Sequence, residues 1–176
     1  TPDPIDDHGH GTACAGVIAA VGNNGTDIAG VCWAARIMPV KILGATGDGT
    51  AADAVPAIHY AVANGADIIS GSWGGTEDSA ILREAIAYAQ AEGVIVVAAA
   101  GNTGLDTPYY PAAYPEVISV AATDWNDRRW YLSNYGAWVD LAAPGQEIVS
   151  LLATLPGRSP RPGYVARLSG TSLATP

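Results

Sequence analysis

The chain has 176 residues, of which 49% are hydrophobic and 14% charged, and its formal net charge is −9. This length suits one domain, and the apolar content is too high for a disordered chain. The acidity argues against nucleic acid and against an anionic membrane as partners, since both are bound through clustered cations. No apolar run approaches the ~20 residues that would span a bilayer.

Short apolar segments alternate with amphipathic ones along the chain. The predicted elements are, in chain order, a helix from His10 to Val21, a strand from Arg36 to Ile42, a helix from Ala51 to Ala63, a strand from Ala66 to Ser70, a helix from Ser79 to Ala91, and strands from Val94 to Ala98 and Val117 to Ala121. The strands are rich in Val and Ile on both faces, as in parallel sheets covered on both sides. The alternation predicts an α/β fold with a doubly wound, mostly parallel sheet and helices on both faces.

Two details refine this pattern. The helix from Ser79 carries an inward stripe of Leu82, Ala85, Ile86 and Ala89. The segment from Arg158 to Arg167 is rich in Pro, Gly and Arg and is predicted to be a loop.

Active sites in open α/β sheets gather where strands end and helices begin. The segments Asp7 to Gly16, Ala98 to Gly104 and Leu168 to Pro176 fall at such junctions. His10 lies between two glycines at a predicted helix start, where an accessible imidazole suits a general base. On this segment alone two alternatives stay open. One is a metal site built from His8, His10 and the carboxylates of Asp6 and Asp7, and the other is a surface histidine without a role.

The other two junctions each offer one polar side chain. Asn102 follows an apolar strand in a Gly-Asn turn, where its amide could donate into a cleft or simply form the turn. Ser172 stands at a predicted helix N-terminus, which suits either a helix cap or a nucleophile beside free N–H groups. The G-x-S-x-G elbow of α/β-hydrolases is not matched, because Ala174 replaces its last glycine.

Together these motifs resemble the subtilisin family of serine proteases. Three motifs in this order account for the resemblance: His10-Gly11-Thr12, Ala100-Gly101-Asn102 and Gly170-Thr171-Ser172-Leu173-Ala174-Thr175-Pro176. Ser72-Trp73-Gly74-Gly75, Tyr110-Pro111-Ala112 and Leu141-Ala142-Ala143-Pro144-Gly145 are similar to the family's substrate-binding strand, cis-proline segment and the strand preceding the nucleophile loop. The resemblance spans essentially the whole chain. It implies that residues 1–176 are a partial subtilisin-like catalytic domain, with the fold incomplete at both ends.

The resemblance also implies roles. Ser172 would attack a peptide carbonyl after His10 removes its proton, and the Asn102 side chain would hold the oxyanion. A protein or peptide substrate would add as a strand between two segments, namely Gly47-Asp48-Gly49 and Ser72-Trp73-Gly74. Trp73 would wall a primary pocket, which in the family usually takes bulky apolar residues. Tyr109 is a candidate to narrow that pocket.

The family's catalytic aspartate is missing. It precedes the histidine by a few dozen residues, whereas only nine residues precede His10 here. Asp6 and Asp7 are too close along the chain to replace it, although Asp7 could touch the His10 ring, and Asp140 is expected to be structural. We therefore expect the chain to be inactive alone and only marginally folded, as the product of a partial gene or a truncated polypeptide. A non-catalytic binding module of the same fold is the alternative.

The remaining expectations concern ligands and thiols. Cys14 and Cys32 are predicted to be free, buried thiols, with Cys14 beside the catalytic pocket. No cofactor is expected for the chemistry. Asn23, Asn24 and Thr26 resemble part of a calcium-binding loop, so structural calcium is expected in a full-length parent rather than in this chain. The parent is expected to be an extracellular monomer.

Overall fold

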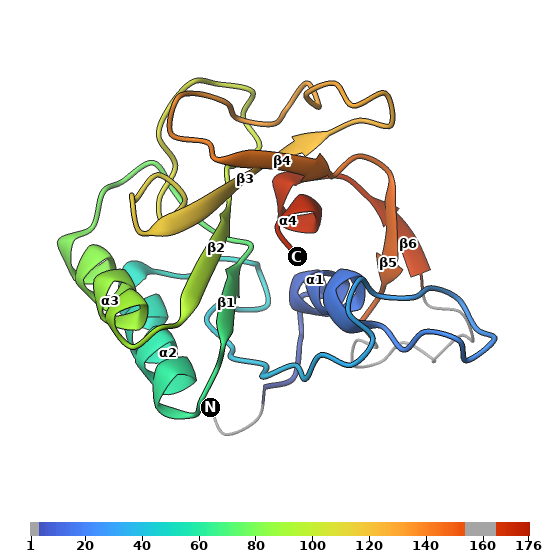
Figure 1. Cartoon of the computed structure of the whole chain (residues 1–176), viewed down its shortest axis with the longest axis horizontal. Helices are drawn as coiled ribbons and strands as arrows, with labels where there is room; N and C mark the ends of the chain where they lie inside the picture. Colours follow the sequence, from blue (N-terminus) through green and yellow to red (C-terminus); the bar gives the residue numbers. More distant parts are fainter. Residues whose placement is uncertain (1–3, 154–164) are drawn as a thin grey trace.

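A computed structural model describes residues 4–153 and 165–176. Its elements are α1 (His10–Ala19), α2 (Ala51–Ala63), β1 (Ile68–Gly71), α3 (Ala80–Ala91), β2 (Ile95–Ala99), β3 (Val117–Thr123), β4 (Leu141–Pro144), β5 (Ile148–Leu151), β6 (Val165–Leu168) and α4 (Thr171–Ala174). Strands β1 to β4 form one parallel sheet in sequential order, and β5 and β6 form an antiparallel pair. Figure 1 shows α2 and α3 on one side of the parallel sheet and α1 and α4 on the other. The predicted α/β class is confirmed.

Helix α3 shows how the sequence pattern becomes packing. Its four stripe residues lie 3, 1 and 3 positions apart, so they share one face. All of them are buried, with at most 4% exposure: Leu82, Ala85, Ile86 and Ala89. They form one core cluster with Ala54 and Ile58 of α2 and with Val96 of β2. Helix α2 begins at a capping box, in which the Thr50 side chain and the Asp53 carboxylate each bond the other's backbone N–H.

Two sequence-based expectations about strands were wrong. Residues 36–42 form no strand, although they are apolar, and the edge strand beside β1 is absent among the described residues. A strand needs a neighbouring ladder for its backbone groups, and Ile37 and Val40 instead remain 43% and 37% exposed. In the predicted loop Arg158 to Arg167, residues 158–164 lie outside the described part, but Val165 to Arg167 belong to β6 and pair with β5.

The two ends of the parallel sheet differ in burial. Near its carboxyl end Ala98 and Ala122 are 0% exposed, and α4 packs on β2, β3 and β4. Its amino end leaves one large apolar side chain of each strand in solvent, namely Ile68, Ile95, Ile118 and Leu141, which are 58, 49, 38 and 50% exposed. Parallel sheets are normally covered on both faces. The well-packed end of this sheet is therefore the one that carries the candidate site.

Candidate active site

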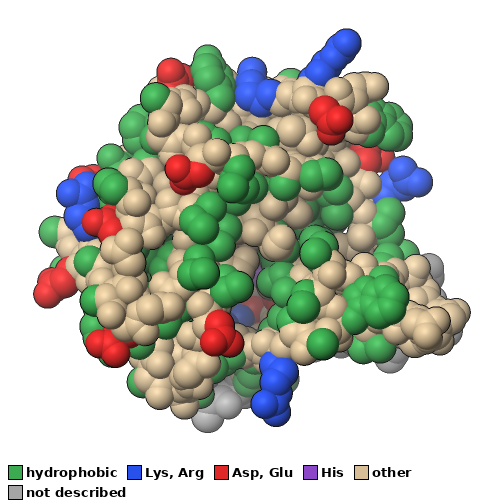
Figure 2. Space-filling model, in the orientation of Figure 1, with side chains coloured by type: hydrophobic (Ala, Val, Ile, Leu, Met, Phe, Trp, Pro, Cys, Tyr) green, Lys and Arg blue, Asp and Glu red, His purple; other side chains and the backbone are tan. Residues whose placement is uncertain are grey.

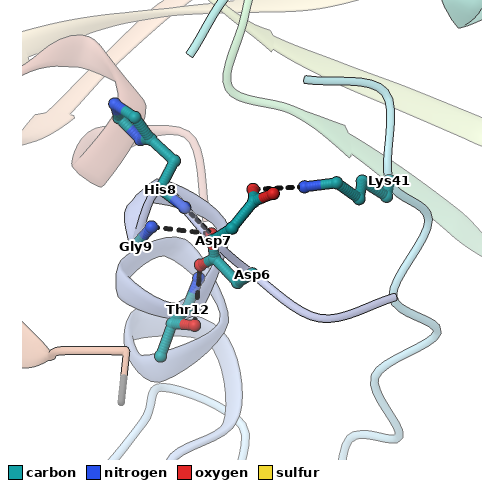
Figure 3. Close-up of polar contacts among 6 residues, drawn as sticks. All are labelled: Asp6, Asp7, His8, Gly9, Thr12 and Lys41. Carbon is teal, nitrogen blue, oxygen red and sulfur yellow. Dashed lines mark hydrogen bonds and ion pairs between the residues drawn. The ribbon is translucent and has the colours of Figure 1, made fainter. Parts of the chain in front are cut away.

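Helix α1 begins at His10 and is held by a carboxylate from outside the helix. Gly9 adopts φ +103°, a conformation open to glycine, and turns the chain into the helix. The Asp6 carboxylate accepts hydrogen bonds from the Gly9 and Thr12 backbone N–H groups at 2.6 and 2.7 Å, and from the Thr12 hydroxyl at 2.7 Å (Figure 3). Partial burial alone would raise the pKa of Asp6, but these bonds and a longer one from the His8 N–H lower it overall. Asp6 is thus an ionised cap for α1.

The His10 ring is half-buried, and its pKa lies below the ordinary value. Desolvation is the main cause, and the charge of His8 adds to it, whereas the Asp6 carboxylate acts in the opposite direction. The His8 and His10 rings meet edge to face, with centroids 6.3 Å apart. Within residues 4–153 and 165–176 the His10 ring has no hydrogen-bond partner. The imidazole is therefore neutral at pH 7, which is the form that can accept a proton.

The Asp7 carboxylate is directed toward Lys41. It pairs with the Lys41 ammonium group at 2.5 Å (Figure 3). This contact is the main cause that lowers the pKa of Asp7. Lys41 belongs to the segment that was expected to form a strand, so the pair ties that segment to the approach to α1. The contact of Asp7 with the His10 ring, which the sequence had left open, is not found among the described residues, where Asp7 pairs with Lys41.

Ser172 is the second residue of α4 and is 9% exposed. Gly170 is the N-cap of this helix, so Ser172 does not serve as its cap. The Ser172 hydroxyl donates to the Ser72 carbonyl at 3.2 Å, while the Ser72 hydroxyl donates back to the Ser172 carbonyl at 2.9 Å. The reciprocal pair joins α4 to the chain leaving β1.

Asn102 lies three residues after the end of β2, directly after the buried Ala100 and Gly101, and is itself exposed. Its side-chain oxygen accepts hydrogen bonds from the Thr171 N–H at 2.8 Å and from the Thr171 hydroxyl at 2.9 Å. With Oδ1 engaged in this way, the amide NH₂ of Asn102 remains as the donor end of the side chain. A methyl group on Gly170 would lie 3.6 Å from Asn102 Nδ2 and 3.8 Å from the Ser172 N. Both nitrogens therefore flank the same small space above Gly170.

Helix α1 approaches this space from the opposite side. The Cys14 thiol lies 3.5 Å from the Ser172 carbonyl oxygen, and His10 precedes Cys14 by one helical turn on the same face of α1. Figure 2 shows that this side of the molecule is hollowed between the surfaces of β1 and α1, with histidine atoms visible inside. The three sequence-predicted residues thus come from α1, α4 and the end of β2 to one region. The described residues nevertheless contain no hydrogen bond between His10 and the Ser172 hydroxyl, which is directed to Ser72.

The predicted substrate-binding segments flank the same region. Ser72-Trp73-Gly74 continues directly from β1, and Trp73 packs on the main core cluster. Gly47, with φ +84°, lies in a turn that the Gly47 N–H and the Gly44 carbonyl close. A methyl group on Gly47 would lie 2.9 Å from His8 Nε2, so the His8 ring covers this turn.

The sequence did not indicate the roles of several residues in this region. The sequence suggested His8 only as a metal ligand, although its ring lies next to both the His10 ring and the Gly47 turn. Thr171, 0% exposed, holds Asn102 and also accepts from the Gly101 N–H at 3.1 Å. The position of Thr171 directly before the predicted nucleophile was the signal that could have marked it. The predicted structural role of Asp140 fits its contacts, since its carboxylate accepts from the N–H and hydroxyl of Ser119 in β3.

Metal ligands and thiols complete the description. The described part of the chain holds no group of three or more His, Cys, Asp or Glu side chains able to bind a metal. Residues 23–29 line a shallow hollow in a loop curled by positive φ at Asn23, Gly25 and Asp27. Both cysteines are free as expected, but Cys32 is exposed rather than buried, because it lies in a surface turn after α1.

Comparison with known proteins defines the class. The model of the subtilase family, peptidase family S8, matches residues 1–176. The chain is 47% identical to thermitase of Thermoactinomyces vulgaris over 173 residues, which cover 98% of this chain and 59% of that protein. It is 45% identical over 174 residues to the thermophilic serine proteinase of Bacillus sp. (strain AK1), covering 99% of this chain and 41% of that protein. Subtilisin Savinase of Lederbergia lenta is 41% identical over 175 residues, with 99% and 62% covered.

This chain belongs to the subtilase family. It spans between about two fifths and three fifths of the length of these relatives. No helix in the described ranges 4–153 and 165–176 is both long and apolar enough to cross a membrane.

Proposed function

We propose that the chain carries the nucleophile side of a secreted serine endopeptidase, with Ser172 as nucleophile, His10 as general base and Asn102 as oxyanion donor. The observation that carries the proposal is the meeting of α1, α4 and the end of β2 around Gly170, in a chain matched along its whole length by the subtilase family. Family resemblance extends the proposal to an extracellular, monomeric enzyme that cleaves protein or peptide substrates.

In the proposed reaction, the Ser172 hydroxyl leaves the Ser72 carbonyl and turns toward His10. The neutral imidazole takes its proton while the oxygen attacks the substrate carbonyl carbon, and the same proton later passes to the leaving amine. The Asn102 amide and the Ser172 N–H donate to the oxyanion that forms. Loss of one such donor costs about 10²–10³-fold in kcat, a value measured on the asparagine of a subtilisin itself.

The chemistry needs no cofactor in this proposal. We further propose that the loop at residues 23–29 contributes oxygen ligands to a structural calcium ion. Its Asn, Thr and Asp side chains are hard oxygen donors, as calcium prefers. The Asn24 side-chain oxygen already accepts from the Thr26 N–H at 3.1 Å, which pre-forms part of the loop. These donors all come from one short loop, whereas calcium takes six to eight oxygens, so this chain would bind the ion weakly.

A second function is favoured by one observation. The Ser172 hydroxyl is bonded to the Ser72 carbonyl, and no carboxylate of the described residues bonds His10. Absence of the orienting carboxylate from a Ser-His-Asp triad lowers kcat by about 10⁴-fold. A chain in this state would bind peptides without turning them over, as the binding-module alternative requires.

One experiment separates the two functions. The purified chain is treated with a serine-directed phosphonate, and the labelled residue is mapped by mass spectrometry beside a chromogenic peptide assay. The peptidase proposal expects labelling at Ser172, with none in the Ser172→Ala variant and slower labelling in His10→Ala, even if peptide turnover by the chain is low. Peptide binding without any labelling of Ser172 would support the binding module instead. Turnover that survives Ser172→Ala would overturn the assignment of the nucleophile.

A further inference from the structure

The segments that follow β1 and β2 flank a gap beside the candidate site, which is called the crevice below and is filled by one side chain. The two strands are neighbours, with Gly71 opposite Ala98 in the register. Beyond that pair the chain continues as Ser72-Trp73-Gly74 on one side and Ala100-Gly101-Asn102 on the other. Each side is fastened to α4, the first through Ser72 and the second through Asn102. In the proposed binding mode the substrate lies along Ser72-Trp73-Gly74 and its carbonyl oxygen reaches Asn102, so a side chain next to the attacked carbonyl would point between these two segments.

The aromatic ring of Tyr109 already occupies this crevice. A methyl group on Gly74 would lie 2.6 and 2.9 Å from ring atoms of Tyr109, and a methyl group on Gly101 would lie 3.0 and 3.1 Å from the same ring. The ring is therefore in contact with the backbone of both walls. A methyl group would also meet the Tyr110 carbonyl oxygen at Gly74 and Asn134 Nδ2 at Gly101, both at 2.5 Å, so the ring is one of several close neighbours at these glycines.

Tyr109 is also fastened in place at both of its ends. Its hydroxyl donates to the Gly74 carbonyl at 2.7 Å. The next residue, Tyr110, exchanges two backbone hydrogen bonds with Gly75, at 2.7 and 2.9 Å. Burial raises the pKa of the Tyr109 hydroxyl, so it stays protonated and remains a donor at neutral and mildly alkaline pH. Moving the ring out of the crevice would break the bond to Gly74 and expose both walls to water.

We propose that Tyr109 closes the depth of the primary substrate pocket and limits the residue that precedes the cleaved bond to a small side chain: glycine, alanine or serine. This inference rests on the proposed function, because it takes Ser172 and Asn102 as the site that the pocket serves. It departs from the preference for bulky apolar residues that the family resemblance implies. The physical reason is that a phenyl or isobutyl group and the Tyr109 ring require the same space between Gly74 and Gly101.

Binding of unreactive peptides tests the pocket separately from the chemistry. Acetyl-Ala-Ala-Pro-Ala-amide and acetyl-Ala-Ala-Pro-Phe-amide are titrated against the full chain, with binding followed by NMR chemical shifts. We expect the alanine peptide to bind at least about tenfold more tightly than the phenylalanine peptide. In Tyr109→Gly the order should reverse, with a change in the ratio of about 10- to 100-fold, as burial of one aromatic side chain provides. Tyr109→Phe keeps the ring and should keep the preference for alanine.

The outcomes are distinct for the inference and for the function on which it rests. If the wild-type chain binds the phenylalanine peptide as well as the alanine peptide, or binds neither, the inference is overturned. An unchanged ratio in Tyr109→Gly overturns it as well, and if that variant does not fold, Tyr109→Ser is used in its place. The expected binding preference without any labelling of Ser172 would leave the inference supported and the peptidase proposal refuted. If instead the chain cleaves the nitroanilides of the same two peptides and prefers the phenylalanine one, the peptidase proposal is supported and the inference about Tyr109 is refuted.

Discussion

Asn102 and Thr171 are joined by two hydrogen bonds, because the Asn102 Oδ1 accepts from both the N–H and the hydroxyl of Thr171, at 2.8 and 2.9 Å. The Thr171 hydroxyl oxygen in turn accepts from the buried Gly101 N–H at 3.1 Å. The turn after β2 and the start of α4 are thereby held as one unit. The orientation of the proposed oxyanion donor thus depends on a residue that need not touch substrate.

This arrangement predicts the effect of Thr171→Val. The substitution keeps the shape of the side chain but leaves the Gly101 N–H without its partner, so the free energy of unfolding should fall by about 1–3 kcal/mol. Urea denaturation monitored by tryptophan fluorescence measures the change. The control is Thr175→Val at the C-cap of the same helix, since the Thr175 hydroxyl donates to a Thr171 carbonyl that also accepts from the Thr175 N–H. Equal losses in the two variants would show that the link to Gly101 and Asn102 adds nothing to stability.

Asp6→Ala should destabilise the chain through the start of α1. The carboxylate satisfies the N–H groups of Gly9 and Thr12, and losing such a cap typically costs about 0.5–2 kcal/mol. Because the folded-state pKa of Asp6 is lowered, its contribution is fully present above the unfolded-state pKa and is lost as pH falls through the folded value. The difference between wild type and Asp6→Ala should therefore be constant near neutral pH and shrink below about pH 4.

Denaturant unfolding at several pH values checks this prediction. Asp7→Ala serves as the comparison, because Asp7 makes an exposed ion pair with Lys41 and should have the smaller effect. A larger effect for Asp7 than for Asp6 would contradict the capping role.

His8→Asn should raise the pKa of His10. The charge of His8 is one of the causes that lower this pKa, while desolvation, the larger cause, would remain. The chain has three histidines, so NMR titration of the ring protons follows each one directly. His59→Asn is the matched control, because His59 stacks on Tyr88 of α3 at a centroid distance of 4.7 Å and belongs to another part of the fold. A His10 titration that is the same in all three proteins would rule out the coupling.

The lowered pKa of His10 also has a consequence for stability. The unfolded chain binds the proton at a higher pH than the folded chain does. The contribution is therefore fully present above the unfolded-state pKa, ~6.5, and is lost as pH falls through the lower folded-state value. In His10→Asn this titration is absent, so the free energy of unfolding should fall less steeply as pH decreases below about 6.5.

The two thiols should react at very different rates. Cys32 is exposed, whereas Cys14 is buried against Ser172, and burial raises the pKa of the Cys14 thiol. Since the thiolate is the reactive form, we expect one fast reaction per chain with a disulfide reagent and a second only after unfolding. Cys32→Ser should abolish the fast reaction, and Cys14→Ser should leave it. Two fast thiols would mean that α1 and α4 are loosely packed, as expected of a marginally folded chain.

Calcium should stabilise the loop at residues 23–29. With a dissociation constant of about 10⁻⁴–10⁻³ M, about 10 mM calcium would add roughly 1–3 kcal/mol of stability. We expect calcium to raise the melting temperature and magnesium not to raise it. In an Asn24→Ala variant the effect of calcium should be lost. No response to calcium would remove the loop from the proposed ligand set.

Apolar patterns predicted helices α1, α2 and α3 and three of the six strands in the described residues, namely β1, β2 and β3. The apolar stripe from Leu82 to Ala89 correctly predicted α3, because the spacing of its residues puts them on one buried face. The strand prediction for residues 36–42 was wrong for a related reason. Apolar residues favour burial, but a strand also needs a neighbouring strand to bond its backbone groups. The hairpin of β5 and β6 was missed because its pairing joins Ile148 to Leu168, contacts that no local pattern encodes.

The sequence by itself determined the family and three candidate residues, His10, Asn102 and Ser172, because their neighbours form short motifs with local meaning. Only the tertiary structure decided which groups those residues meet: Thr171 for Asn102, the Ser72 carbonyl for the Ser172 hydroxyl, and Lys41 for Asp7 in place of His10. It also decided that Tyr109 lies between Gly74 and Gly101. Such partners come from segments far apart in the chain, and they are selected by packing and by the need of buried polar groups for hydrogen bonds.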